Sequence, residues 1–131
     1  MKVTYNDSLN ADELYELFKS AECDDDLPKE KILEAMQKSS RLITVRLEGK
    51  LIGIVRSMDD GVLSADIDCL VVHGEHRHNG VEELLVDEML NVLKDVKYVV
   101  ITADAPELVE IYVTRGFKKP VLGRTLQRVN S

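Results

Sequence analysis

A polar turn in the middle of the chain carries the residues whose types and spacing first suggest chemistry. It follows the apolar run Ile67–Val72, contains Arg77, His78, Asn79 and Gly80, and leads into a helical pattern. A helix start leaves backbone N–H groups without partners, and the positive end of the helix dipole lies behind them. These donors form a natural seat for phosphate, so the turn indicates a phosphate-bearing ligand if the neighbouring elements build the right context.

The same stretch also contains side chains that bind metals, namely Cys69, His73, His76 and His78. Zinc binds about four ligands, each within ~2.0–2.3 Å of the ion. Cys69 and His73 fall on an expected extended strand and its exit, and at ~3.3 Å per residue they are roughly 13 Å apart. We therefore expect surface histidines on a turn and no metal site. A metal-binding regulatory domain is the least supported of three functional interpretations.

The composition is that of one soluble domain. The chain has 131 residues, of which 44% are hydrophobic and 31% charged, and a formal net charge of −7. No apolar run approaches the ~18 residues needed to span a bilayer, and the N-terminus lacks the apolar core of a signal peptide. We expect a cytoplasmic protein that binds neither membrane nor nucleic acid. The negative charge mildly favours a cationic partner, although solubility alone explains such a charge equally well.

The first third of the chain predicts a short strand and two helices. Met1–Tyr5 can form the strand. Asn10 and Glu13 have the spacing of a capping box, after which apolar residues recur at helical spacing. Asp26 is the expected cap of the second helix, with Pro28 in its first turn.

The remainder predicts a sheet with a crossover helix. Leu42–Leu47, Leu51–Met58 and Val62–Val72 are separated by tight turns and should form an antiparallel meander. A helix from Val81 to about Lys94 then connects to Lys97–Thr102, which is nearly all apolar, as a central parallel strand would be. This order implies a right-handed crossover.

A short helix, Pro106–Thr114, follows, and Gly116 should end it. Val121–Val129 alternates enough to be a last strand. The expected class is α+β, with a mixed, mostly antiparallel sheet and helices on both faces, in a single domain over residues 1–131.

This order of elements, with VVHGEHRHNGVEELL after the long strand and PELVEIYVTRGF near the end, resembles the GNAT acyltransferase family. The resemblance covers essentially the whole chain. It implies direct transfer of an acyl group from coenzyme A, with acetyl-CoA the default donor, to a small-molecule or protein amine. A monomer or a homodimer is compatible with it.

The resemblance assigns cofactor-binding residues. The family's Arg/Gln-x-x-Gly-x-Gly/Ala turn cradles the pyrophosphate, and here Arg77 and Gly80 match its first two marked positions. The expected cofactor residues are those of the turn and of the preceding strand, whose backbone would contact the pantetheine arm: Leu70, Val71, Val72, Arg77, His78, Asn79, Gly80, Val81 and Glu82.

The resemblance also assigns catalytic residues. In many members a tyrosine of a Tyr-x-x-x-Gly-Phe pattern protonates the departing thiolate, and Tyr112 with Gly116 and Phe117 matches this pattern. A tyrosine among apolar residues is just as often part of the core. Asp68 or Glu75 is the candidate for the general base that removes the amine proton, directly or through water.

The sequence departs from the family at two positions. Glu82 replaces a small residue of the turn, and Ala105 stands where many members have an asparagine that contacts pantetheine. Asn79 and Glu82 have capping-box spacing, so the carboxylate can bond back to the helix start and occupy the phosphate donors. It can also point outward and leave them free. The alternative function is thus a non-catalytic GNAT-like binding module with a decayed cofactor turn.

The acceptor site is the least defined. In the family, the loop between the first two helices commonly forms one wall of the acceptor cleft. Here that loop carries Glu22, Asp24, Asp25 and Asp26, of which the three aspartates are the candidate substrate-binding residues. They would attract a cationic amine, while a solvated acidic loop explains them as well.

Overall fold

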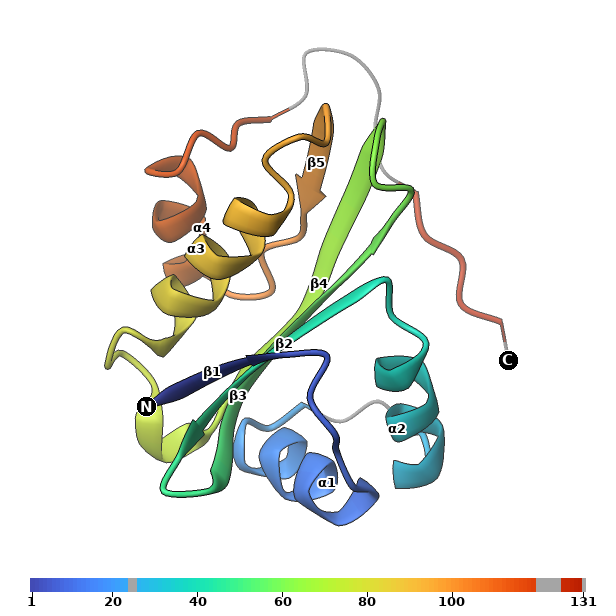
Figure 1. Ribbon diagram of the computed structural model, residues 1–131, viewed down its shortest axis with the longest axis vertical. Helices are drawn as coiled ribbons and strands as arrows, with labels where there is room; N and C mark the ends of the chain where they lie inside the picture. The colour runs from blue at the N-terminus through green and yellow to red at the C-terminus, as the bar shows by residue number, and fades with distance from the viewer. Residues whose placement is uncertain (24–25, 120–125, 131) are drawn as a thin grey trace.

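The computed structural model describes residues 1–23, 26–119 and 126–130 (Figure 1). Its described strands form one sheet in the order β1-β2-β3-β4-β5, antiparallel except for the parallel pair β4–β5. This sheet confirms the mixed, mostly antiparallel arrangement and the meander. The strands are β1 (Lys2–Tyr5), β2 (Arg41–Leu47), β3 (Lys50–Asp59), β4 (Ser64–Val72) and β5 (Tyr98–Ile101).

Helices cover both faces of the sheet, as the sequence predicts (Figure 1). On one face lie α1 (Ala11–Ser20) and α2 (Lys29–Gln37). On the other lie α3 (Val81–Val92) and α4 (Pro106–Val113), and a short 3-10 turn, η1 (Gly74–His76), precedes α3. In the part of the chain that the structure describes, no helix has the length and apolarity to cross a bilayer.

The capping box of α1 forms as predicted. The side chain of Asn10 accepts the backbone N–H of Glu13 at 2.9 Å, and the carboxylate of Glu13 accepts the N–H of Asn10 at 3.0 Å. The predicted cap of α2 is wrong. Pro28, not Asp26, is the residue before the first helical residue, and no side chain caps the helix.

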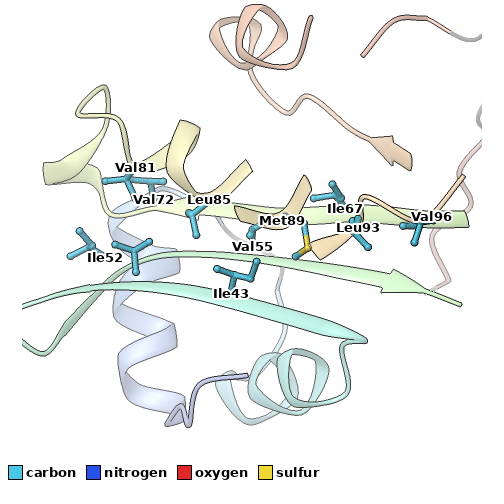
Figure 2. Close-up of a cluster of buried hydrophobic side chains, with 12 residues drawn as sticks. Ile43, Ile52, Val55, Ile67, Val72, Val81, Leu85, Met89, Leu93 and Val96 are labelled. Atoms are coloured by element: carbon cyan, nitrogen blue, oxygen red, sulfur yellow. The ribbon is translucent and has the colours of Figure 1, made fainter. Parts of the chain in front are cut away.

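Two apolar clusters fill the spaces between the sheet and its helices, one on each face. α3 lies close to the strands because β3 has Gly53 beneath it. A Cβ at this position would lie 2.9 Å from Val81 and 3.0 Å from Leu85. The first turn of α3 is thereby held against the sheet. Figure 2 draws this cluster, in which residues of α3 and its end face those of the strands: Ile43, Ile52, Val55, Ile67, Val72, Val81, Leu85, Met89, Leu93 and Val96.

Two predictions for the C-terminal third are wrong. β5 is not central: it is the last strand of the described sheet, and Tyr98 and Val100 remain 56% and 53% exposed. Its apolar run reflects one face packed on the α3 cluster and another that is largely exposed. The predicted strand Val121–Val129 is not formed at 126–129, which is irregular and exposed. Residues 121–125 lie outside the described part.

Candidate functional site

The site begins where β4 and β5 diverge. β4 pairs with β5 only over Ser64–Ile67, opposite Tyr98–Ile101, so the last five residues of β4 have no partner on this side in the described chain. A bulge accompanies the divergence: the register with β3 shifts between Ile54 and Arg56, and Cys69 has a φ of 52°. The extra residue bends β4 away from β5.

The backbone of β4 faces this gap. His73 donates its N–H to the carbonyl oxygen of Ile52 at 2.8 Å, which makes the neighbouring pair of Gly53 and Val72 a non-hydrogen-bonded one. In such a pair, the N–H and C=O groups point away from the partner strand. The N–H of Val72 therefore points into the gap between β4 and β5.

A cleft of about 320 Å³ occupies the gap. The end of α1, the end of β4, the polar turn and the chain after β5 form its walls. Six predicted cofactor residues line it: Leu70, Val71, Val72, Arg77, His78 and Glu82. Asn79, Gly80 and Val81 belong to the turn and the start of α3 but are not among the lining residues. Glu22 of the acidic loop and Ala105, both named from the sequence, also line the cleft. The lining residues that sequence reasoning missed are Ala21, Cys23, Asp104, Glu107 and Leu108.

The polar turn is built differently from the predicted capping box. Gly80, with a φ of 87°, is the residue before α3, and no side chain caps this helix start. Asn79 is therefore not the cap, and that prediction is wrong. Arg77 reaches across the cleft, where its Nη2 donates to the carbonyl oxygen of Ala21 at 2.5 Å.

Glu82 turns its carboxylate toward the turn. The residue is only 9% exposed, and its Oε2 accepts the backbone N–H of His78 at 3.4 Å. Its Oε1 is buried and has no hydrogen-bond partner among the described residues. The sequence leaves open a carboxylate bonded to the helix start and one pointing outward. The carboxylate instead points inward and occupies the N–H of His78, while no side chain caps the start of α3.

Tyr112 is buried at the other side of the same gap. It is 3% exposed, and within the described chain its hydroxyl has no hydrogen-bond partner. Burial, and then the negative charges of Asp104 and Glu82, raise the pKa of this hydroxyl to about 12. Its ring lines an adjacent apolar pocket with Phe117 and does not line the cleft.

The Tyr-x-x-x-Gly-Phe pattern has a local structural cause. Gly116, with a φ of 95°, donates its N–H to Val113, and Phe117 donates its N–H to the carbonyl oxygen of Tyr112 at 3.2 Å. These are the two bonds of a Schellman motif. The turn brings the ring of Phe117 edge-on to that of Tyr112, with centroids 6.0 Å apart. Gly116 thus ends the helix as predicted, and the turn fixes the position of the Tyr112 ring against Phe117.

The other predicted site residues lie outside the cleft lining. Asp68 forms an ion pair with Arg56, Nε to Oδ1 at 2.6 Å, and Glu75 belongs to η1. Asp24 and Asp25 lie outside the described residues, while Asp26 lies beyond the lining of the cleft. No clustering of metal-binding side chains is found among residues 1–23, 26–119 and 126–130.

One of the predicted surface histidines is buried. His73 is 5% exposed, and its Nδ1 accepts the N–H of Glu75 at 3.2 Å. The prediction that all three histidines lie on the surface is therefore wrong for this residue, because η1 folds back and covers its ring.

Comparison with known proteins now gives the class. A family model described as an acetyltransferase (GNAT) domain matches residues 6–128. The chain belongs to the GNAT acetyltransferase family, which confirms the resemblance seen in the motifs. Members of this family are typically acyltransferases that use acetyl-CoA. No protein of curated function matches the chain.

Solved structures share the fold over nearly the whole chain. A probable acetyltransferase from meticillin-resistant Staphylococcus aureus has a TM-score of 0.83 at 22% identity, with 98% of each chain covered. A GNAT family protein from Streptococcus pneumoniae reaches 0.79 at 17% identity, also with 98% of each covered. A ribosomal-protein-alanine N-acetyltransferase from Brucella melitensis biovar Abortus reaches 0.72 at 18%, with 98% of this chain and 99% of that one covered.

Proposed function

We propose that the protein is an N-acyltransferase that moves an acetyl group directly from a pantetheine thioester, by default acetyl-CoA, to a primary amine. The observation that carries the proposal is the gap between β4 and β5, into which the unpaired backbone of β4 points. An arm that carries amide groups can pair with such a strand as an added strand does. The strand end from Leu70 to Val72 would hold the arm.

The chain supplies two groups suited to acyl transfer. The N–H of Val72 would donate to the carbonyl oxygen on which negative charge builds, the largest single effect in many such reactions. The hydroxyl of Tyr112 keeps its proton at neutral pH, because its pKa is raised to about 12, and can give it to a departing thiolate. When bound, the thioester supplies an activated acyl carbon.

The acceptor we propose is an amine that carries additional positive charge. Among the described lining residues there is one guanidinium, that of Arg77, and there are four carboxylates. The carboxylates are those of Glu22, Glu82, Asp104 and Glu107. A cleft lined by one sign of charge concentrates ligands of the opposite sign. Of the residues considered as base, Asp68 is engaged with Arg56 and Glu75 does not line the cleft, which leaves water or a cleft carboxylate to accept the amine proton.

The experiment is a direct assay of transfer. Purified protein is incubated with acetyl-CoA and a panel of amines, and mass spectrometry follows the acetylated product and the released thiol. We expect product with at least one polycationic amine and a higher melting temperature in the presence of acetyl-CoA. No product with any amine, together with no thermal shift, would contradict the proposal.

One observation favours a second candidate, a binding module without turnover. Glu82 occupies part of the turn where the family binds pyrophosphate. Under this alternative, a ligand raises the melting temperature but no amine is acetylated. The buried hydroxyl of Tyr112, beside the gap and without a partner in the described residues, opposes it.

A further inference from the structure

We infer that the donor is recognised through its pantetheine arm and not through its pyrophosphate, because the buried carboxylate of Glu82 takes one N–H of the turn and sets a negative charge beside the helix start that would hold phosphate. The donor class is then pantetheine thioesters in general, with or without an attached adenosine diphosphate. This inference rests on the proposed function, since it names the part of the donor that the same cleft recognises.

The first argument is the contact that Glu82 makes. Its Oε2 accepts the N–H of His78 at 3.4 Å, one of the backbone donors of the turn, three residues before α3. The free N–H groups near a helix start are few, and they are what makes the position an anion site. A carboxylate that belongs to the chain and is always present therefore competes with any phosphate.

The second argument is the burial of Glu82. Its side chain is more than nine-tenths buried, and Oε1 has no partner among the described residues. A buried carboxylate oxygen lacks the water that would screen its charge. A pyrophosphate brought to the turn would meet this charge at short range, and like charges repel more strongly where water is excluded.

The third argument concerns the cation that would offset this repulsion. The guanidinium of Arg77 is drawn to the end of α1, where it donates to the carbonyl oxygen of Ala21. Glu83 adds a further negative charge in the first turn of α3. The turn thus presents a bound carboxylate and an engaged arginine, a poor combination for a doubly charged group.

The arm-binding side of the cleft has no such obstacle. From Asp68 to Val72 the strand β4 has no partner toward β5 within the described chain, and Leu70, Val71 and Val72 line the cleft. Backbone hydrogen bonds to the arm's amide groups do not depend on charge. The wild-type protein should therefore bind the arm alone nearly as well as the whole of coenzyme A.

The experiment compares acetyl-CoA with acetyl-pantetheine by calorimetric titration and by kcat/KM at low salt. For the wild type we expect the affinities and the kcat/KM values of the two donors to agree within about threefold. A turn that bound the pyrophosphate would produce a much larger difference. Glu82→Ala should bind acetyl-CoA about tenfold more tightly, the order expected when one like charge is removed near a phosphate. Its affinity for acetyl-pantetheine should not change.

Two variants separate charge from position. Glu82→Gln keeps the size of the side chain and removes its charge, so it should give part of the gain for acetyl-CoA. Glu83→Gln removes the same charge one residue along, where the side chain makes no contact with the turn's N–H of His78. It should tighten the binding of acetyl-CoA less than Glu82→Gln does, and it should leave the affinity for acetyl-pantetheine unchanged.

The outcomes separate the two proposals. A wild type that prefers acetyl-CoA by roughly 100-fold, with Glu82→Ala unchanged, would mean that the seat is open. That result overturns this inference and leaves the proposed function standing. If no variant binds or consumes either donor, the proposed function fails and the inference fails with it.

Discussion

Arg77 joins the polar turn to the end of α1 through Ala21, whose carbonyl oxygen accepts the guanidinium Nη2 at 2.5 Å. Ala21 is the residue at which α1 ends, where carbonyl groups lack helical partners and a cation is favourable. Beside it, Gly74 donates its N–H to the hydroxyl of Ser20 at 3.2 Å. These two hydrogen bonds, both within the chain, thus hold two walls of the cleft together.

Removing this link should destabilise the fold. We expect Arg77→Met to lower the free energy of unfolding by about 1.5–3 kcal/mol, the range for a hydrogen bond made by a charged group. Urea denaturation measures the change. Arg128→Met, at an exposed position of the same residue type, is the matched control and should change stability little. Equal stability of the two variants would mean that the link contributes nothing.

Much of the fold is readable from the sequence, since the hydrophobic period changes from that of helices to that of strands near Leu42. The meander, the crossover helix and the capping box of Asn10 and Glu13 are predicted from local patterns, and each forms. Local patterns suffice here because short turns and a helix start are decided by residues near one another in sequence.

The site is harder to predict from the sequence, because small differences in local backbone conformation determine it. Whether Glu82 caps the helix or fills the turn depends on which residue precedes α3, and the left-handed Gly80 moves that boundary by one position from Asn79. Asp104 and Glu107 reach the cleft only because β5 runs parallel to β4. No spacing in the sequence signals that contact.

β5 illustrates a different limit. An apolar run predicts burial on both faces, yet Val99 and Ile101 pack against the α3 cluster while Val100 is 53% exposed. The pattern reports the residue types and not the neighbours available to cover them. Sequence alone therefore gives the strand and its direction but not its place at the end of the described sheet.

Tyr112→Phe should separate catalysis from packing. As a general acid, the hydroxyl contributes about 10²–10⁴-fold, so kcat should fall by this order while affinity for the donor stays the same. Stability at neutral pH should be unchanged or slightly higher, because the hydroxyl is buried without a partner in the described residues. Steady-state kinetics and urea denaturation give both answers. Unchanged turnover would assign Tyr112 to the core alone.

The same variant predicts a difference at alkaline pH. The pKa of Tyr112 rises from 10.0 to about 12 in the folded protein, chiefly through burial. The folded state then keeps a proton that the unfolded state loses above pH 10. The stability that the protonated hydroxyl contributes is therefore fully present below pH 10 and is lost as the pH rises through 12. Wild type should lose about 2–3 kcal/mol relative to Tyr112→Phe over this interval, as urea unfolding at several pH values would measure. If the free energy of unfolding changed with pH in the same way in both proteins, the raised pKa of Tyr112 would be refuted.

The charge of the cleft should select the acceptor. Glu22 and Glu107 both line the cleft, from the end of α1 and from α4. The double variant Glu22→Gln/Glu107→Gln should lower kcat/KM for an amine with a second positive charge by about threefold to tenfold at low salt. An amine that carries no other charge should be affected little, because nothing steers it.

Salt provides the decisive comparison for this last prediction. Steering between exposed charges is screened beyond ~10 Å at 0.1 M salt, so the wild type should lose its advantage over the double variant as salt rises. A control that removes two exposed carboxylates outside the cleft lining, Glu48→Gln/Asp95→Asn, makes the net charge less negative by the same amount. If this control behaves like the cleft variant, total charge and not the cleft attracts the acceptor. Equal salt dependence in all three proteins would exclude electrostatic selection altogether.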